Sequence, residues 1–376
     1  MADQLYFSRS TRLYIEQGTN IWEIPVLDGF SFSQSTNASE ITLNEMASDA
    51  GVSRRAKQVF NDSYAPAEWS FSTYARPFIA KDTGDKIWGD TTKHHAVEEV
   101  LWANFVAVNA WDATGKTWTD GVASTTDSMV IDFTGSNSPV LGEISLYFSL
   151  GSCAPAGTTK TVYKISNAVV NSVSIDFEID GICTINWSGF GGTISEAAQE
   201  PTSTIAEAIT ATTNFIRNRL TSLAITADDT TTFPGENSDG VYNAVLTGGN
   251  ITMENNITFL TPETLCTVNH PLGHITGTRS ISGSFTSYLN AATGSTADLF
   301  EDLVGATTTV TNSFDLTFSI GGASAPKIVI NLPQCHLEIP SHSIEDVIAI
   351  EANFTGLPTT LDATDEATIT YVGSAY

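Results

Sequence analysis

The chain has 376 residues, enough for two domains of ordinary size, and its 41% hydrophobic and 15% charged residues are typical of a globular protein. Its 16 Lys and Arg residues against 42 Asp and Glu residues give a formal net charge of -26. Such an acidic chain is not expected to work through a basic surface that binds nucleic acid or anionic lipid, because clustered lysine and arginine hold phosphate groups.

The first half predicts one helix followed by alternating strands. His94–Val106 has apolar residues at helical spacing, with Glu98 and Glu99 expected to face solvent. Apolar and polar residues then alternate in Glu143–Leu150 and in Val173–Ile179, with Ile179 expected on the apolar face. Because successive side chains of a strand point to opposite faces, these strands predict a sheet with one face buried.

The second half shows the same pattern of alternating strands and a short helix. The stretch 195–220 is predicted to be a linker that becomes helical near its end, and Thr296–Val304 a short helix opened by Thr296 as N-cap. Phe314–Ile320 alternates like the earlier strands. The fold class predicted from these patterns is mainly β, in β-sandwich or barrel-like domains that each carry one packed helix.

Similar segments occur in the same order in both halves. Three pairs correspond: Phe7–Leu13 with Phe215–Leu220, Ile24–Glu45 with Ala244–Glu263, and Glu68–Tyr74 with Ser280–Tyr288. We interpret the chain as two copies of one unit, residues 1–195 and 214–376, joined by a linker at 196–213. The alternative is that the halves are two unrelated antiparallel β domains, which resemble each other only as any two such domains do.

The sequence lacks the motifs of catalysis and cofactor binding. It has no Gly-x-Ser-x-Gly elbow, no P-loop and no Gly-x-Gly-x-x-Gly between a strand and a helix. His270 and His274 are separated by a proline and a glycine, which argues against a helical metal site, and adjacent Cys335 and His336 would face opposite sides of a strand. We therefore expect no catalytic residue, no cofactor and no metal.

Acidic residues gather on one predicted strand face and in one loop. Asp176, Glu178 and Asp180 are expected on the exposed face of the strand that begins at Val173. Carboxylate pairs could serve glycoside hydrolysis or bind calcium, but this pattern is that of a solvated strand face. Asp362 and Asp365 lack the spacing of an EF-hand loop.

One basic cluster, Arg54, Arg55 and Lys57, lies in a long loop over Glu40–Tyr64. Three cations cannot form a nucleic-acid groove in so acidic a chain. We interpret the loop as one that docks on an acidic neighbouring subunit, guided by complementary charge.

Several segments, in order along most of the chain, resemble one protein family. The most specific is Glu68–Tyr74; others are Thr42–Glu45, Phe60–Ser63, Thr184–Gly189, Asn255–Pro262, Gly283–Asn290 and Leu361–Glu366. They are similar to the major tail tube proteins of long-tailed siphophages of the tequintavirus kind, in which the tube fold is duplicated within one chain.

The resemblance implies a structural virion protein, made in the host cytoplasm, that forms trimeric, pseudo-hexameric rings stacking into a hollow tube. Its implied partners are other copies of itself, the tape-measure protein in the lumen, and the tail terminator and distal tail proteins at the tube ends. Double-stranded DNA would pass without specific binding, and no membrane is involved. On this basis Arg54, Arg55 and Lys57 are expected to make inter-ring contacts, and Asp176, Glu178 and Asp180 to line the lumen.

Two alternatives remain at this point. A secreted carbohydrate-binding or glycosidase-like β-protein would suit the seven tryptophans and the many acids, but the first twelve residues lack the pattern of a secretory signal. The tube of a contractile tail would usually have a single domain, so the duplication favours the non-contractile type.

Overall fold

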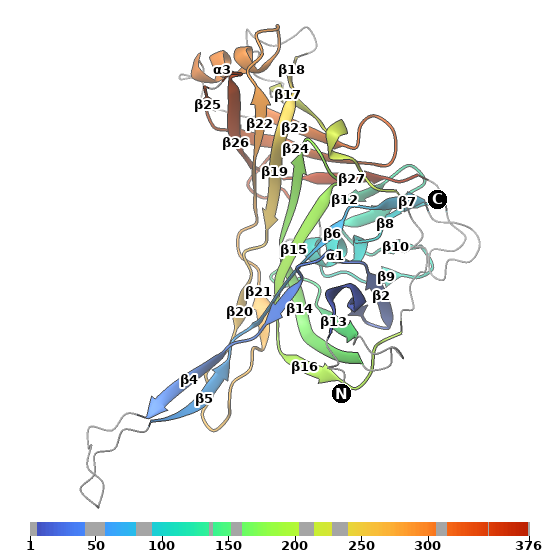
Figure 1. Ribbon diagram of the computed structural model, residues 1–376, viewed down its shortest axis with the longest axis vertical. Helices are drawn as coiled ribbons and strands as arrows, with labels where there is room; N and C mark the ends of the chain where they lie inside the picture. Colours follow the sequence, from blue (N-terminus) through green and yellow to red (C-terminus); the bar gives the residue numbers. More distant parts are fainter. Residues whose placement is uncertain are drawn as a thin grey trace, which may run out of the picture.

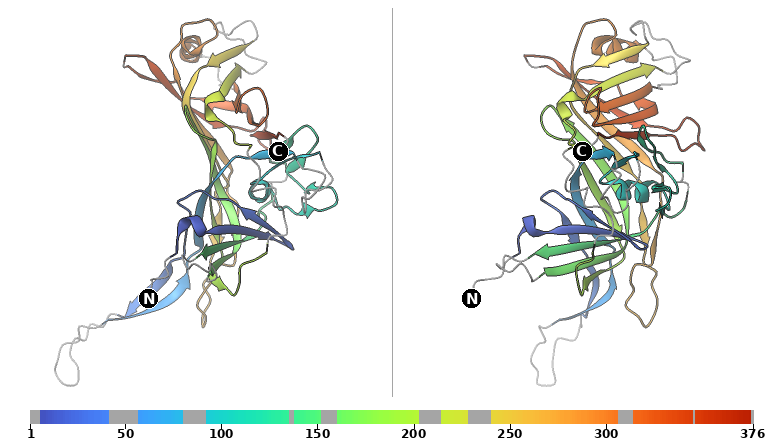
Figure 2. Two further views of the ribbon diagram at one scale, coloured as in Figure 1. Left: turned by 45° about the vertical axis from the view of Figure 1, so that its right-hand side comes forward. Right: turned by 90° about the vertical axis from the view of Figure 1, so that its right-hand side faces the viewer.

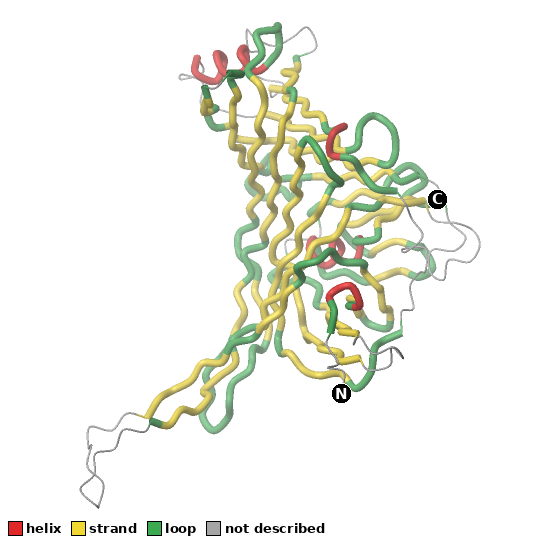
Figure 3. Tube along the Cα trace, viewed as in Figure 1, coloured by secondary structure: helices red, strands yellow, loops and turns green. Residues whose placement is uncertain are grey.

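A computed structural model describes residues 6–41, 57–79, 92–134, 138–151, 160–202, 214–227, 240–305, 314–344 and 346–374. Over these residues the chain is mainly β, with every pair of strands antiparallel and two helices, α1 (Glu99–Val106) and α3 (Thr296–Gly305). Long strands run along the molecule, and shorter elements pack on one side of them (Figures 1 and 3). The predicted fold class is confirmed.

The long strands form one continuous sheet, which we call the wall. Its neighbours in order are β3 (Ser31–Ser33), β6 (Ala67–Tyr74), β15 (Thr184–Gly191), β14 (Lys160–Glu178), β19 (Leu246–Glu254), β22 (Ser280–Tyr288), β26 (Ala349–Gly356) and β24 (Lys327–Leu337). The first four strands come from the first half of the chain and the last four from the second half. The wall therefore joins both halves through the pairing of β14 with β19.

Each half also carries an outer sheet. The first consists of β2 (Asn20–Ile24), β1 (Arg12–Gln17), β13 (Ile144–Gly151), the beginning of β14, and β16 (Ile194–Ala197). The second consists of β18 (Val241–Ala244), β17 (Ser222–Ala227), β23 (Phe314–Ile320), the beginning of β24, and β27 (Thr368–Val372). β14 and β24 thus each belong to an outer sheet and to the wall, and the register of each shifts between the two. Such bulges bend a strand and let it change sheets.

The connectivity of the two halves matches strand by strand. β1, β2, β3, β6, α1, β13, β14, β15 and β16 correspond in order to β17, β18, β19, β22, α3, β23, β24, β26 and β27. The short turns η1 (Ser8–Ser10) and η2 (Asn218–Leu220) precede the first strand of each half. The proposed boundaries at 195 and 214 stay a prediction. β16 extends into the range predicted as a linker, and residues 203–213 lie outside the described part of the chain.

The remaining strands form hairpins and other short pairs, and β25 pairs with the edge of β26. The first arm is β4 (Thr36–Ile41) with β5 (Gln58–Tyr64), and the second arm is Thr258–Ile275, which contains β20 (Thr258–Leu260) and β21 (Gly273–Ile275). Both arms leave the same end of the wall (Figures 1 and 2). The others are β7 (Pro77–Ile79) with β8 (His94–Ala96), β9 (Trp111–Asp112) with β10 (Thr117–Trp118), β11 (Val122–Ser124) with β12 (Met129–Ile131), and β25 (Ser341–Ser343) beside β26.

The core lies between the wall and the outer elements and runs through both halves. Phe177 of β14 lies 5.6 Å, between ring centroids, from Phe318 of β23, and Phe318 lies 5.5 Å from Phe354 of β26. β12 of the first half pairs with β27 of the second. Within the described residues, neither helix is long and apolar enough to cross a membrane.

The structure corrects the prediction for the first helix. His94–Ala96 form strand β8, and the helix begins at Glu99. Glu98 and Glu99 are buried rather than exposed, because Glu99 contacts Trp118 of β10 and Glu98 lies next to Arg76 and Tyr371 of β27. Ile179 was also predicted wrongly as a core residue: β14 ends at Glu178, and the Ile179 side chain is exposed.

Candidate functional site

One face of the wall is polar and is not covered by the outer sheets. Alternate residues of the wall strands on this face are mainly serine, threonine and asparagine, with carboxylates at Glu68, Asp176, Glu178, Glu254 and Glu351. The wall strands contain no lysine or arginine when β14 is counted from Val169 and β24 from Cys335. The opposite residues of the same strands are buried and apolar. The result is an acidic, hydroxyl-rich surface without cations.

Hydrogen bonds between neighbouring strands hold the polar side chains in place. Asn186 Nδ2 donates to Asp176 Oδ2 at 2.6 Å and to Ser174 Oγ at 3.2 Å, and Ser72 Oγ donates to Asn186 Oδ1 at 2.6 Å. Nearer the β3 edge, the hydroxyls of Ser31 and Ser70 lie 2.9 Å apart. Cross-strand pairs of this kind stabilise a sheet and order its surface.

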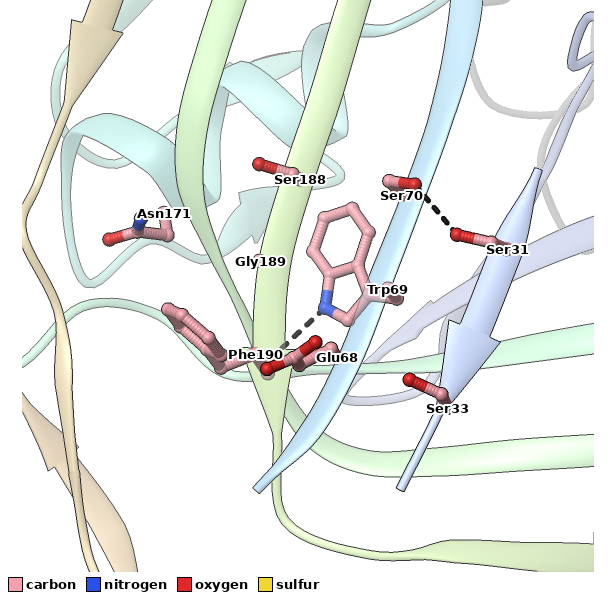
Figure 4. Close-up of a pocket in the computed structure, with 9 residues that line it drawn as sticks. All are labelled: Ser31, Ser33, Glu68, Trp69, Ser70, Asn171, Ser188, Gly189 and Phe190. Atoms are coloured by element: carbon pink, nitrogen blue, oxygen red, sulfur yellow. Dashed lines mark hydrogen bonds between the residues drawn. The ribbon is translucent and has the colours of Figure 1, made fainter. Parts of the chain in front are cut away.

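The polar face is hollowed near β3, β6 and β15 (Figure 4). This shallow depression of about 360 Å³ is lined by serines, by Glu68 and by the aromatic residues Trp69 and Phe190. Trp69 Nε1 donates to Phe190 O at 3.1 Å, so the indole is anchored from within the sheet. The lining offers hydroxyls, one carboxylate and the amide of Asn171, and no set of three or more His, Cys, Asp or Glu residues able to hold a metal occurs among the described residues.

The structure separates the three predicted acidic residues. Asp176 and Glu178 lie exposed on the polar face of β14, as the alternation predicted. Asp180 lies beyond the end of the strand, in a turn, with its carboxylate 3.7 Å from Arg219 Nη1. Asp180 is therefore not part of the strand face, because the chain leaves the sheet before reaching it.

Of the three predicted basic residues, one lies in the described part of the chain. Lys57 precedes β5 at the outer end of the first arm, and its Nζ lies 2.6 Å from Glu40 Oε1 in an exposed ion pair. Arg54 and Arg55 lie outside the described residues.

The histidines considered as metal ligands have structural partners. His270 stacks on Tyr64, with 4.9 Å between ring centroids. His274 is buried, its Nε2 accepts a hydrogen bond from the Leu141 backbone N–H at 2.9 Å, and desolvation lowers its pKa. Cys335 is buried while His336 is exposed, so the two face opposite sides of β24 as expected.

Two features were missed by reasoning from the sequence. The wall has two open edges, β3 and the strand formed by the end of β24 with β25, which pair on one side only among the described strands. The second arm carries several exposed leucines. The sequence of the second arm after Glu263 contains leucines and a valine but no charged residue, and this could have indicated the exposed leucines of the arm. No local pattern marks an edge strand.

Comparison with known proteins identifies a family for this chain. The model of a family described as phage tail tube protein matches residues 26–369. The chain is also 30% identical over 377 residues to the tail tube protein pb6 of Escherichia phage T5, an alignment that covers 96% of this chain and 75% of that protein. The chain belongs to the phage tail tube protein family and is a structural component of the virion tail rather than an enzyme.

Proposed function

We propose that three copies of this chain close into a ring, that the rings stack into a hollow tube, and that the polar face of the wall lines the lumen through which double-stranded DNA passes. The observation that carries this proposal is the pairing of β14 with β19 inside one chain, over Ser172–Glu178 and Gly248–Glu254. It joins the two halves of the wall edge to edge and provides a pattern for joining one chain to the next.

The open edges of the wall correspond to the two strands that already pair. In the matched connectivity β3 corresponds to β19, and β24 with its continuation β25 corresponds to β14. β3 of one chain can therefore lie beside β24 and β25 of the next chain as β19 lies beside β14. Such head-to-tail contacts form a closed ring when the rotation between copies closes. Two similar halves in each of three chains would give the ring pseudo-sixfold symmetry.

The correspondence also predicts the register. Thr252 lies opposite Ser174 in the internal pairing. Thr252 also lies opposite Ser282 of β22, as Ser33 lies opposite Glu68 of β6. Ser282 and Glu68 each come six residues before the tyrosine that ends their strand. Ser33 is therefore the counterpart of Thr252.

The counterpart of Ser174 follows in the same way. Ser174 lies opposite Asn186, and Asn186 lies opposite Ser72, two residues before Tyr74. Thr286 holds that position before Tyr288 and lies opposite Glu351, which in turn lies opposite Ser341 of β25. We therefore expect Ser33 of one chain to face Ser341 of the next.

The chemistry of the polar face supports a conduit. DNA binds protein surfaces by exchanging its counterions for lysine and arginine, so a wall without cations gives it no adhesive contact. Asp176 and Glu178 would repel phosphates and keep DNA away from the surface. Before DNA release, the same lumen would hold the tape-measure protein, and the tail terminator and distal tail proteins would bind the two ends of the tube.

The first arm is proposed to reach the adjacent ring. It extends from one end of the wall, and the loop that it supports carries Arg54 and Arg55 next to Lys57. In a chain of net charge -26, a cationic loop is attracted to almost any other part of a neighbouring copy.

Cysteine cross-linking tests the ring. Ser33→Cys and Ser341→Cys, introduced together with Cys266→Ser to remove an exposed thiol, should form disulfides between chains on oxidation. Covalent dimers and trimers, and no larger species, are expected on a non-reducing gel, and negative-stain electron microscopy should show rings or tubes.

The matched control replaces Glu351 with cysteine instead of Ser341, because Glu351 lies one strand inside the wall. It should give no cross-link with Ser33→Cys. Tubes without cross-linked trimers would overturn the proposed register, a ladder beyond three chains would overturn the trimer, and a chain that forms neither rings nor tubes would overturn the proposal as a whole.

A further inference from the structure

The second arm exposes an unusual amount of apolar surface. The side chains of Leu265 and Leu272 are 95% and 71% exposed, and Leu260, Val268 and Ile275 are also exposed. Single apolar residues on a surface are ordinary, but five exposed ones on a single projecting hairpin mark a contact surface.

The tip of this arm is also free of charge. From Thr264 to Ile275 the sequence has no aspartate, glutamate, lysine or arginine, in a chain with 42 acidic residues. Two copies of so acidic a protein repel each other over most of their surfaces. The tip of the second arm is a segment that can approach another copy without that repulsion.

Several contacts hold the arm in one conformation. The Leu272 N–H donates to Leu260 O at 2.9 Å, and the Tyr64 N–H donates to Asn269 O at 3.0 Å. The Tyr64 ring also stacks on the neighbouring His270. An arm ordered before binding loses less conformational entropy when it docks, so more of the apolar burial contributes to affinity.

A second exposed apolar group lies at the opposite end of the wall. It flanks β25 and consists of Ile339, Ile344, Val347 and Ile348, and we call it the rim. The side chains of Ile344 and Val347 are 81% and 59% exposed. The ribbon views place β25 and β26 at the end of the wall away from β20 and β21 (Figures 1 and 2).

We propose that the second arm of one copy docks on the rim of a copy in the adjacent ring, with the leucines of the arm covering the isoleucines and valine of the rim. This inference rests on the proposed stacking of rings and names the surfaces that make it. Two apolar surfaces at opposite ends of an elongated chain are arranged for head-to-tail growth along the wall.

The docking has a consequence for symmetry. The first arm carries Glu40, Lys57 and Asp62 beside the exposed Val59 and Phe60, whereas the tip of the second arm exposes leucines and has no charged residue, so a pseudo-sixfold ring presents two chemically different arms in alternation. A rotation by one position would place Glu40 and Asp62 of the first arm over a rim that carries Asp346, which adds like-charge repulsion to the cost of desolvating the charged groups. Adjacent rings therefore match in three rotational positions rather than six.

Paired serine variants test the contact. Leu265→Ser with Leu272→Ser, and separately Ile344→Ser with Val347→Ser, should leave rings of unchanged mass and reduce the fraction of protein in tubes at least tenfold. Sedimentation and electron microscopy measure both quantities. Leu361→Ser is the matched control, because Leu361 is fully exposed and lies outside the arm and the rim.

A cross-link tests the partner directly. Cys266 is exposed next to Leu265, so Val347→Cys should allow oxidation to link chains of adjacent rings, and the link should disappear in the further variant Cys266→Ser. Leu361→Cys should give no link. Normal tubes from both serine pairs would overturn the docking and leave the tube itself intact, whereas an unaltered chain that forms no tubes would overturn both proposals.

Discussion

Two adjacent buried glutamates at the start of α1 have different surroundings. Glu99 Oε1 accepts a hydrogen bond from Trp118 Nε1 at 3.0 Å, and its Oε2 lies 2.9 Å from His95 Nδ1 and accepts from the Ala96 N–H at 3.3 Å. Burial raises the pKa of Glu98 from 4.5 to about 7, and the charge of Arg76 offsets part of that increase. Glu98 is thus poised to lose its proton near neutral pH inside the core.

Glu98→Gln should remove a pH-dependent loss of stability. Because the folded pKa of Glu98 lies above its unfolded pKa, the wild-type chain loses stability as pH rises from 4.5 to about 7, and the loss is complete above that pH. The gap between the two pKa values corresponds to roughly 3 kcal/mol.

Thermal unfolding measures the effect. The variant should unfold at a higher temperature than the wild type at pH 8 and at about the same temperature at pH 4. A difference that is equal at both pH values would show that the carboxyl group does not titrate between them.

The surroundings of these residues also show which buried positions of α1 could be predicted from the local sequence. Helical spacing correctly placed Leu101, Trp102 and Phe105 in the core. It could not show that Glu98 and Glu99 are buried too, because Arg76, Trp118 and Tyr371, which surround them, lie in other elements and come together only after folding.

At the scale of elements, alternation predicted single strands well and their bends poorly. β23 has the predicted bounds, and β13 begins one residue later than predicted. β14 is a 19-residue strand in which the face that points to the core changes at the register shift after Val170, so its pattern reads as two short strands. A bulge is set by the partners of a strand, which local sequence does not specify.

The first arm carries a prediction of its own. Replacing Arg54, Arg55 and Lys57 with glutamine should impair tube formation while leaving the chain folded. The exposed pair of Lys57 with Glu40 contributes at most about 1 kcal/mol, so its loss does not unfold the arm. Circular dichroism checks the fold, and electron microscopy of the purified variant counts tubes.

The control removes the same amount of charge elsewhere. Arg12, Arg219 and Lys327 lie outside the first arm, and their replacement with glutamine should leave tube formation unchanged. Normal tubes from the arm variant would remove the loop from the inter-ring contact, and equal impairment in both variants would point to net charge rather than to the loop.

At the scale of the whole molecule, the wall joins what the sequence presented as separate halves. The similar segments correctly anticipated the repeated connectivity of strands. They could not show that β14 and β19 pair, because an edge contact between two units depends on which strands remain open after each unit has folded. Net charge likewise described the surface only as an average, because it could not show that the described strands of the wall contain no lysine or arginine on their polar face.

Glu178→Lys tests whether that face lines the lumen. In a trimeric ring this variant replaces three carboxylates with three ammonium groups on the wall, where they can release counterions from DNA. Tubes assembled with short double-stranded DNA at low salt should then hold DNA that is protected from nuclease, and the protected amount should fall steeply as salt rises.

The exposed Glu196 of the first outer sheet provides the matched control, because Glu196→Lys makes the same change of charge away from the wall. DNA bound by that variant would lie outside the tube and remain open to nuclease. Protection in the Glu178 variant alone places the polar face inside the tube. Equal protection in both variants, or in neither, would mean that the acidic face of β14 looks outward, and the absence of cations from the wall would then need another explanation.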